Sequence, residues 1–149
     1  MARLGGAECT TIKFANIANI HYMRDSFIAL RGVCCAVDKS QYHYRISDSK
    51  WLQYISDLLS GAVYIAQHLE RGDPVLRHCS DGWDRTAQLS CLSQLLLDPY
   101  YRTIEGFRDL INKDWIEFGH MFGIRNSADN SDSSPIFLQF LDAGNCLIH

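Results

Sequence analysis

Leu76-Arg77-His78-Cys79-Ser80-Asp81-Gly82-Trp83-Asp84-Arg85-Thr86 is the stretch around which the whole sequence is organised. It reads as an extended run that ends at Cys79, a turn that contains Gly82, and a helix that begins near Thr86. We interpret this stretch as a phosphate-binding loop that carries a thiolate nucleophile.

The loop combines the groups that a phosphate monoester dianion requires. The backbone N–H groups of Ser80 to Arg85 would surround one centre if the loop curls. The following helix would direct its positive N-terminal end at the same centre. Arg85 lies five residues after Cys79 and can fold back to hold two phosphate oxygens with its planar guanidinium, which a lysine cannot do.

The same surroundings predict an ionised thiol at Cys79. A free thiol has a pKa of about 8.5, and a helix N-terminus with an adjacent cation lowers such values to about 3.5–7.5. Thr86 is placed to donate its hydroxyl to the sulfur. We expect His78 to orient the loop through hydrogen bonds, because a thiolate that is already formed needs no base.

Two carboxylic acids in the loop are candidates for the general acid that protonates the leaving alkoxide. Beside a bound phosphate dianion, Asp81 or Asp84 could be held protonated. We favour Asp84, next to Arg85, and expect Asp81 to hydrogen-bond substrate hydroxyls. The sequence alone leaves the order of these two roles open.

A bare Cys-x5-Arg pattern is common by chance, but the complete run from His78 to Thr86 is much rarer. This run resembles the signature of the myotubularin family. The resemblance extends over roughly residues 3 to 142 and includes Asn19-Ile20-His21, Met23-Arg24, Trp51-Leu52, Leu97-Asp98, Tyr100-Tyr101-Arg102-Thr103-Ile104, Gly106-Phe107, Lys113-Asp114-Trp115, Phe118-Gly119-His120, Ser134-Pro135, Phe137 and Gln139-Phe140.

The resemblance implies a phosphatase that removes the 3-phosphate of phosphatidylinositol 3-phosphate or of phosphatidylinositol 3,5-bisphosphate. It assigns substrate contacts to Asn19, to the loop residues Ser80, Asp81, Gly82, Trp83, Asp84 and Arg85, and to Arg125. In active relatives a basic residue and the counterpart of Arg125 resemble a clamp for the 5-phosphate. Met121 occupies the basic position here, which weakens the case for the bisphosphate. Asn19 could equally be a helix cap, and Arg125 a solvated charge.

The resemblance also implies a protein that works on membranes. It suggests a cytoplasmic enzyme peripheral to endosomal membranes, and homo- or hetero-oligomers with other myotubularins through regions absent here. A complete domain of that family starts well before the counterpart of Met1. We therefore expect a partial phosphatase domain over residues 1–142 and a divergent tail over 143–149.

Composition agrees with a small cytosolic domain. The chain has 149 residues, of which 47% are apolar, and a net charge of −3. No polybasic run suggests nucleic acid as a partner, and neither a membrane span nor a signal-peptide pattern is evident. The six cysteines show no Cys-x2-Cys pairing, so we expect no metal and no cofactor.

The remaining pattern predicts an α/β fold of the cysteine-phosphatase type, with a central, mainly parallel sheet flanked by helices. Strands are expected at residues 10–17 and 75–78, and a surface connection at 34–47. Helices are expected from Ile20 to Gly32, from about Ser49 to Leu69, from Thr86 to before Pro99, after the cap Thr103, and after Pro135. The helix that ends at Leu69 should bury one apolar stripe, formed by Leu52, Ile55, Leu58, Leu59, Ala62, Ile65, Ala66 and Leu69.

Arg77 is unusual in a strand that should be enclosed. A charge there is costly unless it is paired, so we expect Arg77 either to reach a carboxylate or to lie on a less enclosed strand. Two other functions compete with a lipid phosphatase: a product that binds a headgroup or partner without turnover, and a protein tyrosine or dual-specificity phosphatase. An unstable fragment is the third alternative.

Overall fold

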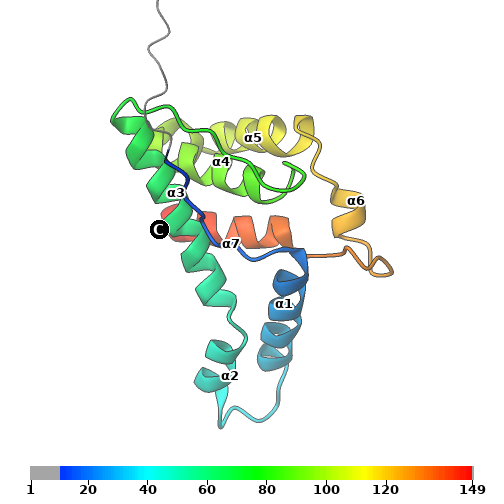
Figure 1. Cartoon of the computed structure of the whole chain (residues 1–149). Helices are drawn as coiled ribbons and strands as arrows, with labels where there is room; N and C mark the ends of the chain where they lie inside the picture. Colours follow the sequence, from blue (N-terminus) through cyan, green and yellow to red (C-terminus); the bar gives the residue numbers. More distant parts are fainter. Residues whose placement is uncertain (1–10, 149) are drawn as a thin grey trace, which may run out of the picture.

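Every regular element is helical in residues 11–148, the part of the chain that this computed structural model describes (Figure 1). The elements are α1 (Ile20–Cys34), α2 (Tyr42–Asp48), α3 (Trp51–Glu70), α4 (Arg85–Leu97), the 3₁₀ turn η1 (Pro99–Arg102), α5 (Ile104–Ile111), the π-helical turn η2 (Asn112–Glu117), α6 (Phe122–Arg125) and α7 (Ile136–Ile148).

The predicted central, mainly parallel sheet is therefore wrong for the described residues. Residues 11–17 and 75–78, the expected strands, are stretches of chain without ladder pairing, and Thr10 lies outside the described residues. A strand exists only when a second strand takes up its N–H and C=O groups. Apolar and β-branched residues supplied the propensity in both segments, but no partner strand lies beside them in the part described.

α4 is the central helix of the bundle. Eight of its residues, consecutive from Ala87 to Ser93 and then Leu95, are buried, which is typical of a helix covered on all sides. α3 and α7 both pack against α4 and against each other. Gln88, fully buried on α4, donates to the Gln139 side-chain oxygen at 2.8 Å and to the Ile136 carbonyl at 3.0 Å, which fixes α7 in place.

The predicted apolar stripe of the third helix is confirmed over its middle turns. Ile55, Leu58, Ala62, Ile65 and Ala66 are buried along α3. The predicted stripe is too long, because Leu52 and Leu69 at its ends are exposed. The helix that precedes the segment leading into the loop is thus held by core packing along its middle turns.

Aromatic side chains close the other side of the core. Trp115 on η2 and Phe140 on α7 are fully buried and lie 5.0 Å apart between ring centroids. Thr103 caps α5, as predicted, by accepting from the Gly106 amide at 3.0 Å. α4 ends at Leu97, before Pro99, also as predicted.

α1 and α2 extend from the main bundle beside the end of α3 (Figure 1). Asn19 caps α1 by accepting from the His21 and Tyr22 amides. The expected surface connection at residues 34–47 is only partly right, because α2 forms within it. α7 continues past residue 142, and Ala143 is buried in the core; the division between residues 1–142 and 143–149 stays a prediction.

Candidate active site

The loop from Cys79 to Asp84 lies at the N-terminal end of α4. α4 begins at Arg85, one residue before the predicted start. Gly82 has a φ of +90°, a conformation that glycine adopts without a steric penalty and that other residues rarely adopt. This turn reverses the chain between Cys79 and the first turn of α4, so the sulfur stays close to the helix N-terminus.

Cys79 is partly buried inside this turn. The Gly82 amide donates to the Cys79 sulfur at 3.2 Å. Burial acts to raise the pKa of the thiol, but the Thr86 hydroxyl and the amides of Gly82, Thr86 and Asp81 outweigh burial and lower the pKa. The Thr86 hydroxyl is buried without a hydrogen bond of good geometry, so it acts on the sulfur as a nearby dipole. The thiol is thus biased toward the thiolate.

Arg85 folds back over the loop. Its Nη2 atom donates to the Ser80 hydroxyl at 3.1 Å. The Ser80 hydroxyl in turn donates to the exposed Asp81 carboxylate at 3.3 Å. Arg85 therefore lies on the same side of the loop as the residues whose amides would bind phosphate, and no salt bridge within the described residues occupies its guanidinium.

Asp84 lies in a different environment from Asp81. Its side chain is 8% exposed and accepts from Arg125 at 2.7 Å and 3.2 Å. His120 Nδ1 lies 3.1 Å from Asp84 Oδ1 and 2.9 Å from the Trp83 carbonyl. The Trp83 carbonyl and the ionised Asp84 carboxylate are both hydrogen-bond acceptors, so Nδ1 of His120 carries the proton that it shares with them.

These contacts hold Asp84 as a carboxylate. Burial acts to raise the pKa of Asp84, but the hydrogen bonds from His120 and Arg125, together with the positive charge of Arg125, lower it. The pKa of Arg125 is raised, mainly by its hydrogen bond to Asp84. Arg125 is 7% exposed and also donates to the Asp132 carbonyl at 2.9 Å. Its guanidinium is fully engaged within the protein, while Met121 is exposed.

The other predicted site residues are placed at varying distance from this centre. His78 is exposed and makes no side-chain hydrogen bond to any described residue. Trp83 is partly buried, and its indole N–H has no partner within the described residues. Asn19 is exposed and uses its side-chain oxygen to cap α1. The structure thus places Thr86 and the Gly82 amide around the Cys79 sulfur, and Arg85 against Ser80 of the same loop.

Four polar residues near the loop, Arg77, Ser90, Asp114 and His120, were not predicted as site residues from the sequence. Arg77 donates to the Ser90 hydroxyl, which donates to the buried Asp114 carboxylate. Arg77 thus contacts no carboxylate directly, and it is only partly buried on a segment without ladder pairing, which agrees with the less enclosed of the two expected placements. His120, next to Asp84, entered the sequence analysis only as part of the Phe118-Gly119-His120 resemblance. Charged and imidazole side chains inside apolar stretches were the available signal.

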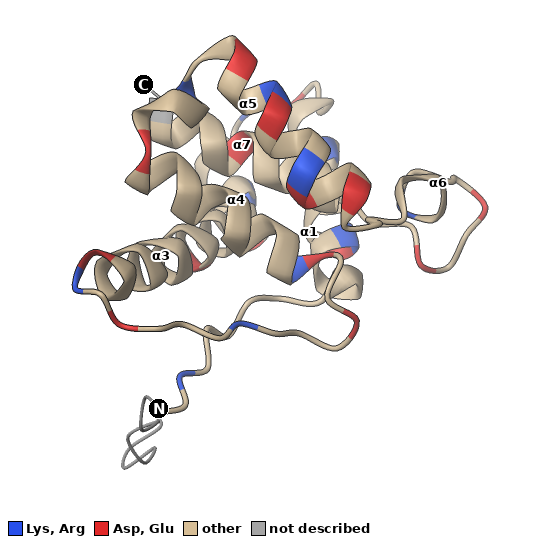
Figure 2. Cartoon of the chain, turned by 90° about the horizontal axis from the view of Figure 1, so that it is seen from above, with Lys and Arg blue, Asp and Glu red and all other residues tan. Residues whose placement is uncertain are grey.

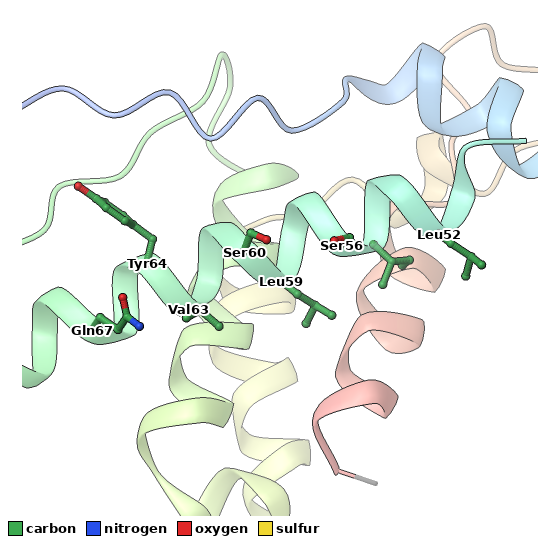
Figure 3. A pocket seen from close by; sticks show the side chains of 8 residues that line it. Leu52, Ser56, Leu59, Ser60, Val63, Tyr64 and Gln67 are labelled. Atoms are coloured by element: carbon green, nitrogen blue, oxygen red, sulfur yellow. The ribbon is translucent and has the colours of Figure 1, made fainter. Parts of the chain in front are cut away.

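No metal-binding cluster occurs among the described residues, and the hollow along α3 does not include the loop. Among them, no group of three or more His, Cys, Asp or Glu residues is placed to bind a metal ion. A hollow of about 520 Å³ runs along one face of α3, lined by Leu52, Leu59, Val63, Tyr64 and neighbours (Figure 3). Its lining includes none of the loop residues and offers no pair of titratable groups, so we assign it no part in the chemistry.

Charge is spread over the surface. In the view of Figure 2, acidic and basic residues alternate along α5 and are scattered elsewhere. No helix among the described residues is long and apolar enough to cross a membrane.

Comparison with known proteins relates this arrangement to an enzyme family. The myotubularin-like phosphatase domain matches residues 6–149. The proteins named phosphatidylinositol-3,5-bisphosphate 3-phosphatase MTMR4 from Mus musculus and Homo sapiens are each 46% identical over 155 residues, covering 95% of this chain. Myotubularin from Rattus norvegicus is 46% identical over 139 residues, covering 88%. The chain spans only 13% of the first two relatives and 23% of the third.

Proposed function

The chain belongs to the myotubularin-like phosphatase family, and from that membership we propose that it hydrolyses the 3-phosphate of phosphatidylinositol 3-phosphate. The observation that carries the proposal is the Cys79 thiol, whose pKa burial acts to raise but the Thr86 hydroxyl and the amides of the loop lower, with the Gly82 amide 3.2 Å from the sulfur. An anionic sulfur among N–H donors, with Arg85 folded over the same loop, is what a phosphate-transfer reaction by a cysteine requires.

In the proposed first step the Cys79 thiolate attacks phosphorus in line with the inositol oxygen. The amides of Ser80 to Arg85 and the Arg85 guanidinium stabilise the equatorial oxygens, and Trp83 and Gly82 shape the loop around them. For this step Arg85 must leave Ser80, at 3.1 Å in the ligand-free chain, and donate to phosphate oxygens instead. The S–P bond forms as the P–O bond to inositol breaks.

Asp84 is proposed as the donor of the proton that the leaving inositol oxygen takes. Burial acts to raise the pKa of this carboxyl but hydrogen bonds from His120 and Arg125 lower it, so substrate has to raise the pKa again, and a phosphate dianion nearby acts in that direction. Asp81 would hydrogen-bond the inositol hydroxyls. The reverse assignment uses the exposed Asp81 as the acid. It predicts that Asp81→Asn slows the first step more than Asp84→Asn does.

The second step releases phosphate from Cys79. A water molecule gives a proton to the carboxylate formed in the first step and attacks phosphorus, so the S–P bond breaks and the thiolate returns. The low pKa of Cys79 makes the sulfur a good leaving group. The Thr86 hydroxyl stabilises the departing thiolate, and His78 is proposed to support the loop when substrate is bound.

The monophosphate is the proposed substrate in preference to the 3,5-bisphosphate. A 5-phosphate needs its own cations, but Arg125 is buried against Asp84, and the neighbouring candidate position holds Met121. Releasing Arg125 toward a 5-phosphate would leave the Asp84 carboxylate without its cation. Asn19, at the exposed start of α1, is proposed to contact the headgroup.

Several wider features follow the family rather than the geometry of this chain. We propose a phosphoinositide at a membrane surface as substrate, a cytoplasmic location peripheral to endosomal membranes, and oligomers with other myotubularins. A phosphatase segment over residues 1–142 with a tail over 143–149 belongs to the same group of proposals. No nucleic acid and no cofactor take part in the proposed reaction.

The test is phosphate release from short-chain phosphatidylinositol 3-phosphate by the purified 149-residue chain. Cys79→Ser should abolish release, whereas Cys146→Ser, at an exposed cysteine of α7, should leave it unchanged. Equal release by the chain and Cys79→Ser would leave only headgroup or partner binding. Faster turnover of a phosphotyrosine peptide than of the lipid would indicate a tyrosine phosphatase.

A further inference from the structure

The segment that leads into Cys79 is held to the protein without a backbone ladder. Within the described residues, no backbone–backbone hydrogen bond involves residues 74–83. Burial alternates along the segment: Val75 packs against the core, Leu76 is 93% exposed, and Arg77 is partly buried. This alternation is typical of extended chain. Side chains on one face of the segment therefore have to hold the nucleophile in position.

Arg77 provides the polar contact on that face. Its Nη2 atom donates to the Ser90 hydroxyl on α4 at 2.6 Å. It is the one side-chain hydrogen bond that joins residues 74–78 to another element in the described part of the chain. Val75 supplies only apolar contact, which resists separation but does not fix where the segment sits along α4. The hydrogen bond to Ser90 supplies that register.

Ser90 passes the contact on to a buried carboxylate. Its hydroxyl donates to Asp114 Oδ2 at 3.1 Å. The same carboxylate oxygen accepts from Gln94 and weakly from Cys91, and Lys113 donates to the Gln94 side-chain oxygen. Asp114 therefore joins α4 to η2, and burial beside Asp114 raises the pKa of the Cys91 thiol, which keeps Cys91 neutral.

Charge explains why an arginine occupies position 77. Asp114 is 7% exposed, and no cation contacts it directly within the described residues. A buried carboxylate without a nearby positive charge is strongly unfavourable. Arg77, one hydroxyl away, adds a positive charge to that of Lys113, which is linked to Asp114 through the Gln94 side chain. Its guanidinium and the Asp114 carboxylate attract each other across Ser90, so the attraction pulls the segment before Cys79 onto α4.

We propose that Arg77 is a positioning residue, which holds Cys79 at the N-terminus of α4 through the Arg77–Ser90–Asp114 relay. The proposal rests on the function proposed above only for its catalytic consequence. Its immediate effect is on the thiol. If the segment shifts, the Cys79 sulfur moves away from the Gly82 amide, which now lies at 3.2 Å, and from the neighbouring donors. The thiolate then loses the hydrogen bonds that stabilise it.

The experiment measures the alkylation rate of Cys79 by iodoacetamide against pH, with each cysteine followed by peptide mass spectrometry. In Arg77→Met the rate at a pH below the Cys79 pKa should fall about three- to tenfold, as expected for a rise of roughly half a unit to one unit in that pKa. At a pH above the thiol pKa of both proteins the rates should converge. Arg77→Lys, which keeps the charge and one donor, should recover part of the loss.

Ser90→Ala separates positioning from a direct effect of the Arg77 charge. This variant keeps the arginine but removes the group that it binds, so it should reproduce the loss in Arg77→Met. Ser93→Ala is the matched control, because Ser93 is also buried on α4 but bonds to the Leu89 and Ala62 carbonyls. The double variant of Arg77 and Ser90 should be no slower than the slower single variant.

Three results would overturn the proposal. The first is an unchanged pH profile of Cys79 alkylation in Arg77→Met, and the second is a normal alkylation rate in Ser90→Ala when Arg77→Met is slowed. The third is a loss of rate in the double variant that equals the sum of the two single losses. Circular dichroism of each variant identifies one that fails to fold, and Arg77→Lys then carries the test. The assay uses no substrate. If the chain releases no phosphate but its Cys79 alkylation rate depends on Arg77, the proposed function is refuted and the positioning role of Arg77 stands.

Discussion

The buried pair of Asp84 and Arg125 predicts how far a single substitution should destabilise the protein. Arg125→Met keeps the length of the side chain and removes its charge. The substitution deletes the two hydrogen bonds to Asp84, at 2.7 Å and 3.2 Å, and the one to the Asp132 carbonyl. It leaves a carboxylate that is 8% exposed with His120 as its remaining polar partner.

The magnitude has a lower and an upper bound. Removal of one partner of a buried ion pair typically costs about 3–5 kcal/mol. The unpaired Asp84 carboxyl can avoid part of this free-energy cost by taking up a proton. At pH 7 protonation costs about 4 kcal/mol for a group with an ordinary pKa of about 3.9. We therefore expect Arg125→Met to lower the free energy of unfolding by about 3–4 kcal/mol at pH 7.

The assay is urea unfolding followed by helical circular dichroism at pH 7 and pH 4.5. In the unsubstituted chain the lowered pKa of Asp84 gives stability that is present above the unfolded value and is lost as pH falls through the folded value. In Arg125→Met the penalty shrinks as pH falls, because protonating the stranded carboxyl costs only about 1 kcal/mol at pH 4.5. The difference between the two proteins should therefore narrow by roughly half or more toward pH 4.5.

Two further proteins control this reasoning. The double variant Arg125→Met with Asp84→Asn removes both charges and should recover most of the loss. Arg108→Met breaks a pair with Asp109 at 3.5 Å whose arginine side chain is 70% exposed, so it should cost at most about 1 kcal/mol. A loss below about 1 kcal/mol in Arg125→Met, or one that grows toward acid pH, would refute the argument.

Three other substitutions give further tests. Gly106→Ala places a methyl group 2.0 Å from the Tyr100 carbonyl oxygen and should cost about 1–3 kcal/mol of unfolding free energy, whereas Gly123→Ala meets no atom within 4 Å and should be neutral or stabilising. Asn19→Ala removes the cap of α1 and should lower the free energy of unfolding by about 1 kcal/mol, measured in urea. Asn19→Ser should retain the cap, so a raised KM in this variant would indicate that the Asn19 side chain contacts the headgroup. Gly82→Ala, at a φ of +90°, should strain the loop by about 1–2 kcal/mol and slow Cys79 alkylation at neutral pH, and an unchanged alkylation rate would contradict the loop geometry.

Local signals in the sequence predicted the helices that frame the site. Thr103 caps α5 and α4 stops before Pro99, because both effects depend on neighbouring backbone groups alone. The start of α4 followed from the Gly82 turn and the polar residues after it. The stripe of α3 was predicted for the same reason: residues three and four apart share one face whatever packs against them.

Features set by distant parts of the chain could not be predicted in this way. A strand is completed by another segment, so residues 75–78 had strand character in the sequence and no ladder in the described structure. Asp84 and Arg125 are 41 residues apart, and nothing local to either indicates the other. Arg77 carried a usable signal because a charge in an apolar run needs a partner, although the sequence does not name Ser90 or Asp114.

The fold and the proposed reaction require opposite protonation states of Asp84. As a stabilising group it must be ionised, since it gains from Arg125 and His120 only as a carboxylate. As an acid it must be protonated before the inositol oxygen leaves. Phosphate can reconcile the two, because its negative charge beside Asp84 disfavours a second negative charge and so favours the neutral carboxyl. A 5-phosphate that drew Arg125 away would favour protonation more strongly, but it would do so by breaking the buried pair that stabilises this end of α4. The monophosphate makes no such demand, and this difference is the physical basis for preferring it as substrate.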